Sequence, residues 1–171
     1  MDILVVMKRP NLLAILQNTY KWEDIHNRLV NYEKTLDKRT LGGLLESFCE
    51  YYYRAEPTVS NDYQNVWRFE NVPEEIKTKL NLGKRDGGVD VLLQGYDGSF
   101  SAVQCKFKSN QDNILSWSKD KIANLFGEGN KADFCIVFTN ASGVDRHTSK
   151  KEKLKGLFAI IIYICLTHEH I

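Results

Sequence analysis

The sequence lacks the features that would place it in a specialised class of protein. Neither sign of charge dominates, since 23 Lys and Arg face 22 Asp and Glu, so any nucleic-acid surface must be a local basic patch. No GxxxxGK[ST] motif occurs, so this chain by itself should not hydrolyse ATP. The apolar run from Leu157 to Leu166 is half the length of a membrane span. We therefore expect a globular protein that does not enter the membrane.

Cysteine is also scarce. The four cysteines lie far apart in apolar stretches, without a CxxC pair or a histidine at zinc-ligand spacing: Cys49, Cys105, Cys135 and Cys165. We expect them to be reduced residues of the core. The apolar run from Ile3 to Met7 is too short for a signal peptide. These absences favour a reducing, cytoplasmic compartment.

A length of 171 residues fits one domain with a substantial core. We expect residues 1–38 to form an N-terminal helical accessory segment and residues 39–171 to form the main domain. Hydrophobic residues recur at helical spacing from Asn11 to Tyr32, with a break near Lys21 to Asp24, which predicts two short helices. A stronger amphipathic pattern follows, with Thr40 as its expected N-cap.

The remaining segments predict an α/β domain with a central mixed sheet flanked by helices. From Ala55 to Gly88, frequent helix and strand breakers indicate mostly loop, apart from an amphipathic stretch at Glu74 to Leu80. Gly127 is expected to stop a helix that precedes it. The later chain is predicted to form a β-hairpin, an amphipathic helix and two buried strands, at residues 89–107, 113–126, 134–140 and 157–166.

The hairpin is the clearest local signal. The strand-like runs VDVLLQ and FSAVQCKF flank the turn residues Asp97 and Gly98. If these two residues alone form the turn, Asp90 opposes Cys105. If the loop is the three-residue YDG with Gly98 in the left-handed conformation, Asp90 opposes Gln104 instead. The pattern itself allows both registers.

The second register brings together the residues that phosphodiester hydrolysis requires. Asp90, Gln104 and Lys106 then share one face of the hairpin. A carboxylate holds a hard cation, an amide oxygen is a weaker ligand of the same kind, and a lysine beside them can orient or help deprotonate the attacking water. These residues also have structural interpretations. Asp90 could form an ion pair with Lys106, and Gln104 and Lys106 could be the solvent-facing residues of a strand that alternates polar and apolar side chains. On this register the apolar face consists of Val91, Leu93, Val103, Cys105 and Phe107.

These residues also carry a family resemblance. GGVDVLL (Gly87 to Leu93) followed by VQCKF (Val103 to Phe107) resembles the PD-(D/E)xK nuclease superfamily, and in particular the Mrr-like restriction endonucleases, whose motif reads D...QxK. The resemblance covers roughly Leu41 to Asn140. It implies a restriction-endonuclease-like fold for the main domain and a metal-dependent DNA endonuclease activity.

The resemblance also implies a metal site. The family has a helix before the hairpin that contributes a glutamate, and LGGLLESFCEYYY places Glu46 in that role, although a glutamate off the apolar stripe of a helix is usually just solvated. The expected cation is Mg²⁺, with Mn²⁺ able to substitute. Many relatives have an acid where Gln104 stands, so one metal ion is favoured over two. The implied ligands are Asp90, Glu46, Gln104 and the backbone carbonyl of Cys105, with Lys106 as the catalytic lysine.

Basic residues outside this motif are candidates for contacts with the DNA backbone. They lie before the hairpin, just after it, and in the densest basic run of the chain: Lys84, Arg85, Lys108, Lys150, Lys151 and Lys153. A solvated loop and a charged surface helix are the alternatives for the same residues.

The expected partner is DNA, most simply double-stranded. Mrr-like domains commonly lie at one end of larger restriction or helicase-linked proteins, so the resemblance implies fusion to, or association with, a helicase or translocase motor. The first alternative function is a Holliday-junction resolvase, because such resolvases share the fold and motif. They are usually dimers, so a homodimer also stays open. A catalytically weak DNA-binding module is a second alternative, and an RNA substrate a third.

Overall fold

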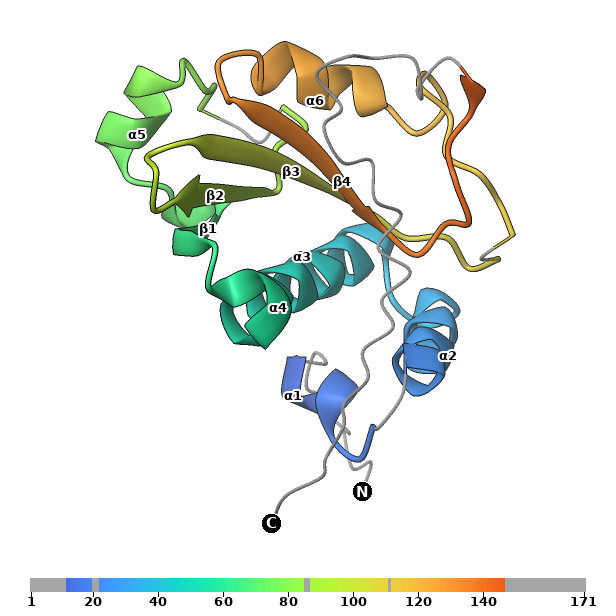
Figure 1. Ribbon diagram of the computed structural model, residues 1–171. Helices are drawn as coiled ribbons and strands as arrows, with labels where there is room; N and C mark the ends of the chain where they lie inside the picture. The colour runs from blue at the N-terminus through green and yellow to red at the C-terminus, as the bar shows by residue number, and fades with distance from the viewer. Residues whose placement is uncertain (1–11, 20–21, 85–86, 111, 147–171) are drawn as a thin grey trace, which may run out of the picture.

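A four-stranded mixed sheet organises the chain (Figure 1). The computed structural model describes residues 12–19, 22–84, 87–110 and 112–146. The strands follow the spatial order in which they occur in the sequence; the first three are antiparallel neighbours and the last pair is parallel. They are β1 (Tyr63–Arg68), β2 (Val91–Gly95), β3 (Phe100–Lys106) and β4 (Phe134–Thr139).

Helices cover both faces of this sheet (Figure 1). The long helix α3 (Lys38–Ala55) lies across one face, with α1 (Leu12–Leu16) and α2 (Trp22–Glu33) packed beyond it. The opposite side carries α5 and α6. Their bounds, with those of the two short connecting helices, are α4 (Pro57–Ser60), η1 (Phe69–Asn71), α5 (Glu74–Lys79) and α6 (Ile122–Glu128). The predicted α/β architecture, a mixed sheet flanked by helices, is confirmed.

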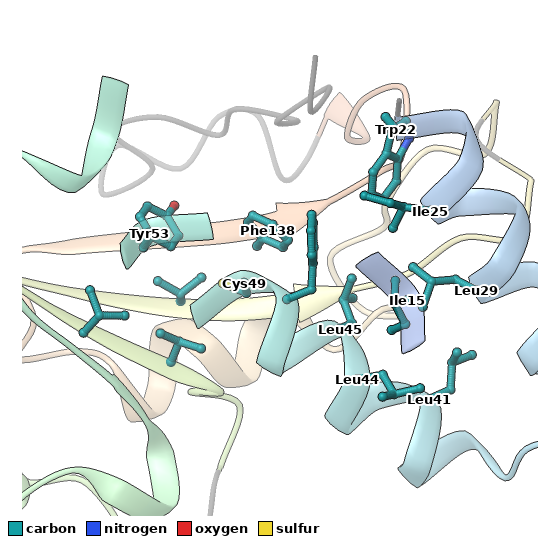
Figure 2. Packing of buried hydrophobic residues seen from close by; sticks show 14 of the residues in the cluster. Ile15, Trp22, Ile25, Leu29, Leu41, Leu44, Leu45, Cys49, Tyr53 and Phe138 are labelled. Carbon is teal, nitrogen blue, oxygen red and sulfur yellow. The ribbon is translucent and has the colours of Figure 1, made fainter. Parts of the chain in front are cut away.

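The hydrophobic core has two parts, one on each face of the sheet. On the α3 side, side chains of the three N-terminal helices meet those of the strands around Phe138 of β4 (Figure 2). The apolar face predicted for the hairpin belongs to this part: Val91, Leu93 and Val103 are buried in it, and Cys105 and Phe107 pack against it. The part on the other face joins β2, β3 and β4 to α6 and to the segment around α5.

The hairpin has the three-residue loop. Leu92 pairs with Ala102 and Gln94 with Phe100, and the Gly95 N–H donates to the Ser99 carbonyl oxygen over 2.9 Å. Gly98 adopts φ of +83°, the left-handed conformation that this loop needs. The register that the chemistry favoured is therefore the one that forms.

Helix α3 begins earlier than predicted, because Asp37 and not Thr40 is its N-cap. One Asp37 carboxylate oxygen accepts the Arg39 and Thr40 N–H groups at 3.0 Å each, and the Thr40 hydroxyl donates to the other at 2.6 Å. Thr40 thus stabilises the cap from the first turn of the helix. A carboxylate at this position also interacts favourably with the helix dipole.

Substituting this cap should lower thermal stability. Asp37→Ala leaves the first N–H groups of α3 without acceptors, and we expect its Tm to fall by about 3 °C. Asp37→Asn caps equally well and should stay close to wild type. The Thr40 hydrogen bonds hold the pKa of Asp37 below its ordinary value, so the stabilisation is present above the unfolded-state pKa and is lost as pH falls through the lowered one. Thermal melts of wild type and Asp37→Ala at pH 7 and pH 3 test the cap and its pH dependence, and the difference in Tm should be smaller at pH 3. Equal Tm values of the two proteins at pH 7 would refute the role of the cap.

Two other predictions of local structure were wrong. The segment from Ala55 to Gly88 holds strand β1, where mostly loop was expected, although the expected amphipathic stretch is α5. The helix predicted for residues 113–126 exists only as α6, because Leu115 forms a bridge with Val144 and Lys121 adopts φ of +56°. Gly127 lies inside α6, whose C-cap is Gly129.

The two short N-terminal helices are confirmed as α1 and α2, but α2 begins at Trp22, so the break lies earlier than predicted. The strand predicted for residues 157–166 lies outside the described residues. Among the helices that the structure describes, none combines the length and the hydrophobicity needed to cross a bilayer.

Candidate active site

Asp90 lies at the entrance to β2, where the backbone brings it against β3. Its N–H donates to the Val103 carbonyl oxygen over 2.8 Å, and its own carbonyl oxygen accepts the Phe69 N–H at 3.0 Å. Gly88, two residues earlier, has φ of +122°, and a Cβ there would lie 3.0 Å from the α6 backbone, so glycine allows the chain to pass this close to α6. The Asp90 backbone is therefore fixed between β3 and the start of η1 (Phe69–Asn71), just after the chain passes close to α6 at Gly88.

The Asp90 carboxylate is directed at the motif of β3. Its Oδ2 accepts the Cys105 N–H at 2.6 Å. Cys105 stands between Gln104 and Lys106, so the carboxylate meets the strand at the centre of the predicted motif. Because the N–H and C=O of one residue in a β-strand point to the same side, the Cys105 carbonyl also faces the side on which Asp90 lies.

Gln104 supplies an unusual buried acceptor. The residue is 3% exposed, and its Oε1 has no hydrogen-bond partner among the described residues. A buried amide oxygen without a partner costs about 1–3 kcal/mol, so native proteins seldom keep one without a reason. A cation or a polar group bound at the site would remove this cost.

Glu46 reaches the neighbourhood of Asp90 from α3. It is half-buried and forms an ion pair with Arg68, the last residue of β1, through Oε2 at 3.1 Å. Burial raises the pKa of the Glu46 carboxyl above its ordinary value, the Asp90 charge raises it further, and Arg68 acts in the opposite direction. The two carboxylates are thus close enough to repel one another.

The lysines of the hairpin differ in their contacts. Lys106 is partly buried, and its ammonium has no hydrogen bond or ion pair within the part of the chain that the structure describes. Lys108, predicted to contact DNA, donates to Asp120 at 2.6 Å, and its backbone is held on both sides by the Asn140 amide. Lys84, another predicted DNA contact, is exposed. Arg85, Lys150, Lys151 and Lys153 lie outside the described residues.

Comparison with known proteins identifies the family. The family model described as "Restriction endonuclease" (Mrr_cat_2) matches residues 54–153, more than half of the 171 residues. The chain belongs to this family of restriction endonucleases. Its members generally use divalent metal ions. No curated protein matches the sequence.

A solved structure agrees with this restriction endonuclease fold. The "ATP-dependent Type ISP restriction-modification enzyme LlaBIII bound to DNA" superposes with a TM-score of 0.53 and 22% sequence identity, over 75% of this chain. At that identity the likeness concerns the fold. The chain spans only 8% of that enzyme's chain.

The residues around Asp90 in this member of the restriction endonuclease family fit a hard divalent cation. Carboxylates, amide oxygens and backbone carbonyls are the ligands that Mg²⁺ and Mn²⁺ accept, and Gln104 Oε1 is buried with no hydrogen-bond partner among the residues that the structure describes. Within the described residues, no group of three or more His, Cys, Asp or Glu side chains is close enough to hold a metal. A metal site here would therefore need the amide of Gln104 in addition to the carboxylates of Asp90 and Glu46.

One residue near the site was missed at the sequence level. Arg68 contacts Glu46 and stands opposite Val91, next to Asp90 along β2. It was overlooked because its segment was assigned to a loop. The signal was present, since YQNVWR combines aromatic and β-branched residues between the breakers at Asn61-Asp62 and Pro73.

Proposed function

We propose that this chain is a Mg²⁺-dependent endonuclease domain that hydrolyses phosphodiester bonds of double-stranded DNA. One observation carries the proposal: the Asp90 carboxylate binds the backbone of β3 directly between Gln104, whose buried amide oxygen has no described partner, and Lys106. An acid at the entrance to β2 therefore lies against the segment of β3 that carries an amide and a lysine, which supports the proposal. Membership of a restriction endonuclease family supports the same conclusion.

Each residue has a distinct part in the proposed reaction. The oxygen of a water molecule bonds to phosphorus and gives up a proton to solvent, the bond from phosphorus to one bridging oxygen breaks, and that leaving oxygen takes a proton from solvent. Asp90, Glu46, Gln104 and the Cys105 carbonyl would hold the cation. When bound, Mg²⁺ would polarise the phosphate and lower the pKa of a water molecule. The Lys106 ammonium, with three donor hydrogens, would hold the attacking water and offset charge that develops on the phosphate oxygens. The Cys105 N–H fixes the Asp90 carboxylate and limits its rotation.

The wider setting of this activity is also part of the proposal. The sequence has no P-loop, so any dependence on ATP would come from a motor on the same or another protein. The similar solved structure is of an ATP-dependent enzyme bound to DNA, which supports a DNA substrate and an association with an ATP-driven motor. We further propose a cytoplasmic location, where DNA is accessible and thiols stay reduced.

The test is plasmid cleavage by the purified chain with Mg²⁺, Mn²⁺ or EDTA. Lys106→Met removes the ammonium while retaining the length of the side chain, and we expect the rate of Mg²⁺-dependent nicking to fall about a hundredfold. DNA affinity without metal should change little, because one phosphate contact at most is lost.

Lys131→Met is the matched control. Lys131 is exposed and precedes β4 at the end of the sheet away from Lys106, which pairs with Thr139. The Lys131→Met variant should cleave the plasmid at the wild-type rate. Equal cleavage by Lys106→Met and wild type would exclude the proposed role of this lysine. DNA binding without cleavage in either metal would instead support a binding module.

A further inference from the structure

The side chain of Arg68 contacts three other side chains near the proposed site. Its Nη2 lies 3.1 Å from Glu46 Oε2 and 3.1 Å from Glu70 Oε1, and its Nη1 donates to the Ser47 hydroxyl at 3.0 Å. Two of these partners are consecutive residues of α3. The guanidinium therefore connects the end of β1 to the turn of α3 that presents Glu46.

This contact occupies only one side of the Glu46 carboxylate. Arg68 holds Oε2, whereas no described residue hydrogen-bonds Oε1. The side chains of Arg68 and Glu46 are only 24% and 23% exposed, so the pair is shielded from water more than a surface ion pair is. A carboxylate held by one oxygen is free to bind a cation with the other.

We infer that Arg68 is a positioning residue that holds Glu46 through Oε2 and leaves its Oε1 available to a cation. This inference rests on the proposed function, since it assumes a cation held by Glu46 and Asp90. Partners of metal-binding carboxylates set their orientation, and replacing such a partner typically lowers metal affinity about 10- to 100-fold. Arg68 also offsets the repulsion between the two carboxylates before the cation arrives.

The other ion pair of Arg68 does not account for its position. Glu70 is 55% exposed, and a pair with so exposed a partner contributes little to stability. A second arginine provides the contrast: Arg54 pairs with Glu50 of the same helix at 3.0 Å and donates to the Val66 carbonyl oxygen of β1 at 2.6 Å. Arg54 thus links α3 to β1 as Arg68 does, but through residues outside the proposed site.

The experiment measures Mn²⁺ binding to the full chain without DNA, by electron paramagnetic resonance. Arg68→Gln should weaken Mn²⁺ affinity by about tenfold or more. Arg68→Lys, which keeps the charge but cannot contact both Glu46 and Ser47 with a fork, should fall between wild type and Arg68→Gln. Arg54→Gln is the matched control and should bind Mn²⁺ like wild type. Circular dichroism confirms that each variant is folded.

A double mutant tests whether Arg68 acts through Glu46. If it does, Arg68→Gln combined with Glu46→Gln should bind Mn²⁺ no more weakly than Glu46→Gln alone. Wild-type affinity in folded Arg68→Gln, an equal loss in Arg54→Gln, or no Mn²⁺ binding by the wild-type chain would each overturn the inference. If Arg68→Gln does not fold, Arg68→Lys replaces it in the same comparisons of Mn²⁺ affinity, alone and combined with Glu46→Gln.

The outcomes separate this inference from the proposed function. A wild-type chain that cuts DNA while Arg68→Gln keeps full Mn²⁺ affinity retains the function and rejects the role of Arg68. A chain whose Mn²⁺ binding depends on Arg68 but which cuts no DNA retains the role and rejects the function.

Discussion

Replacing Asp90 with Asn is expected to reduce Mg²⁺-dependent DNA cleavage by about 10³-fold or more. This corresponds to about 4 kcal/mol of lost transition-state stabilisation. The substitution removes the charge that would hold the cation but keeps an oxygen that can accept the Cys105 N–H, so the strand entrance should stay in place. Single-turnover nicking of a supercoiled plasmid, with enzyme in excess, measures the effect on the chemical step.

The control for this substitution is Asp62→Asn. Asp62 is exposed and precedes β1, whose first residue pairs with Gly95 at the hairpin end of the sheet, far along the strands from Asp90. It should cut like wild type. Persistent cleavage by folded Asp90→Asn, or an equal loss in both variants, would show that Asp90 does not hold the metal. Rescue of Asp90→Asn by high Mn²⁺ would support its role as a ligand.

The hairpin was predictable because two local signals and one chemical requirement agree. The strand-like runs fixed its position, and a glycine that can adopt φ above zero permitted the three-residue loop. Sequence alone did not choose between the registers, since both leave polar residues on a face. The choice depended on the assumption that Asp90, Gln104 and Lys106 act together, and the strand pairing agrees with that register.

The helix predicted after the hairpin failed for a reason outside its own sequence. Its apolar residues do have helical spacing, and Leu115, Ile122 and Leu125 are all buried. However, Leu115 exchanges hydrogen bonds with Gly143 and Asp145, and Asp120 accepts the Ser116 N–H at 2.7 Å. The two Leu115 hydrogen bonds to the chain after β4, together with the Ser116–Asp120 hydrogen bond inside the segment, accompany a non-helical path that ends at Lys121. A tertiary pairing of this kind leaves no mark on local periodicity.

The site itself was only partly accessible from sequence. A resemblance could suggest Glu46, but its neighbourhood depends on Arg68, which reaches it from a strand 22 residues later in the chain. That Gln104 Oε1 is buried without a hydrogen-bond partner in the described part of the chain is likewise a property of the three-dimensional structure. Functional sites retain the free-energy cost of such a buried acceptor, because an apolar residue at the same position would avoid the cost but could not bind a cation.

The second large effect is on stability and concerns Phe138. Phe138 is 0% exposed and lies beside Tyr53 in the core (Figure 2). Its ring centroid lies 6.1 Å from that of Phe48, 5.7 Å from that of Tyr52 and 6.2 Å from that of Tyr53. Phe138→Ala should lower the free energy of unfolding by about 4 kcal/mol, because rigid neighbours cannot close the cavity. Urea unfolding followed by circular dichroism measures the change.

The position of Phe138 links this stability to the site. Phe138 pairs with Cys105 across β3 and β4, and Cys105 is the residue whose N–H holds Asp90. Phe138→Leu should lower the free energy of unfolding by less than Phe138→Ala, because leucine fills more of the space. Ile114→Ala is the control: Ile114 is 55% exposed, so its replacement should change the free energy of unfolding by less than about 0.5 kcal/mol. If the α3 side of the sheet supports Asp90, folded Phe138→Leu should also bind Mn²⁺ more weakly than wild type, whereas Ile114→Ala should not. A Phe138→Ala protein as stable as Ile114→Ala would mean that the aromatic cluster repacks and does not hold β4 against α3.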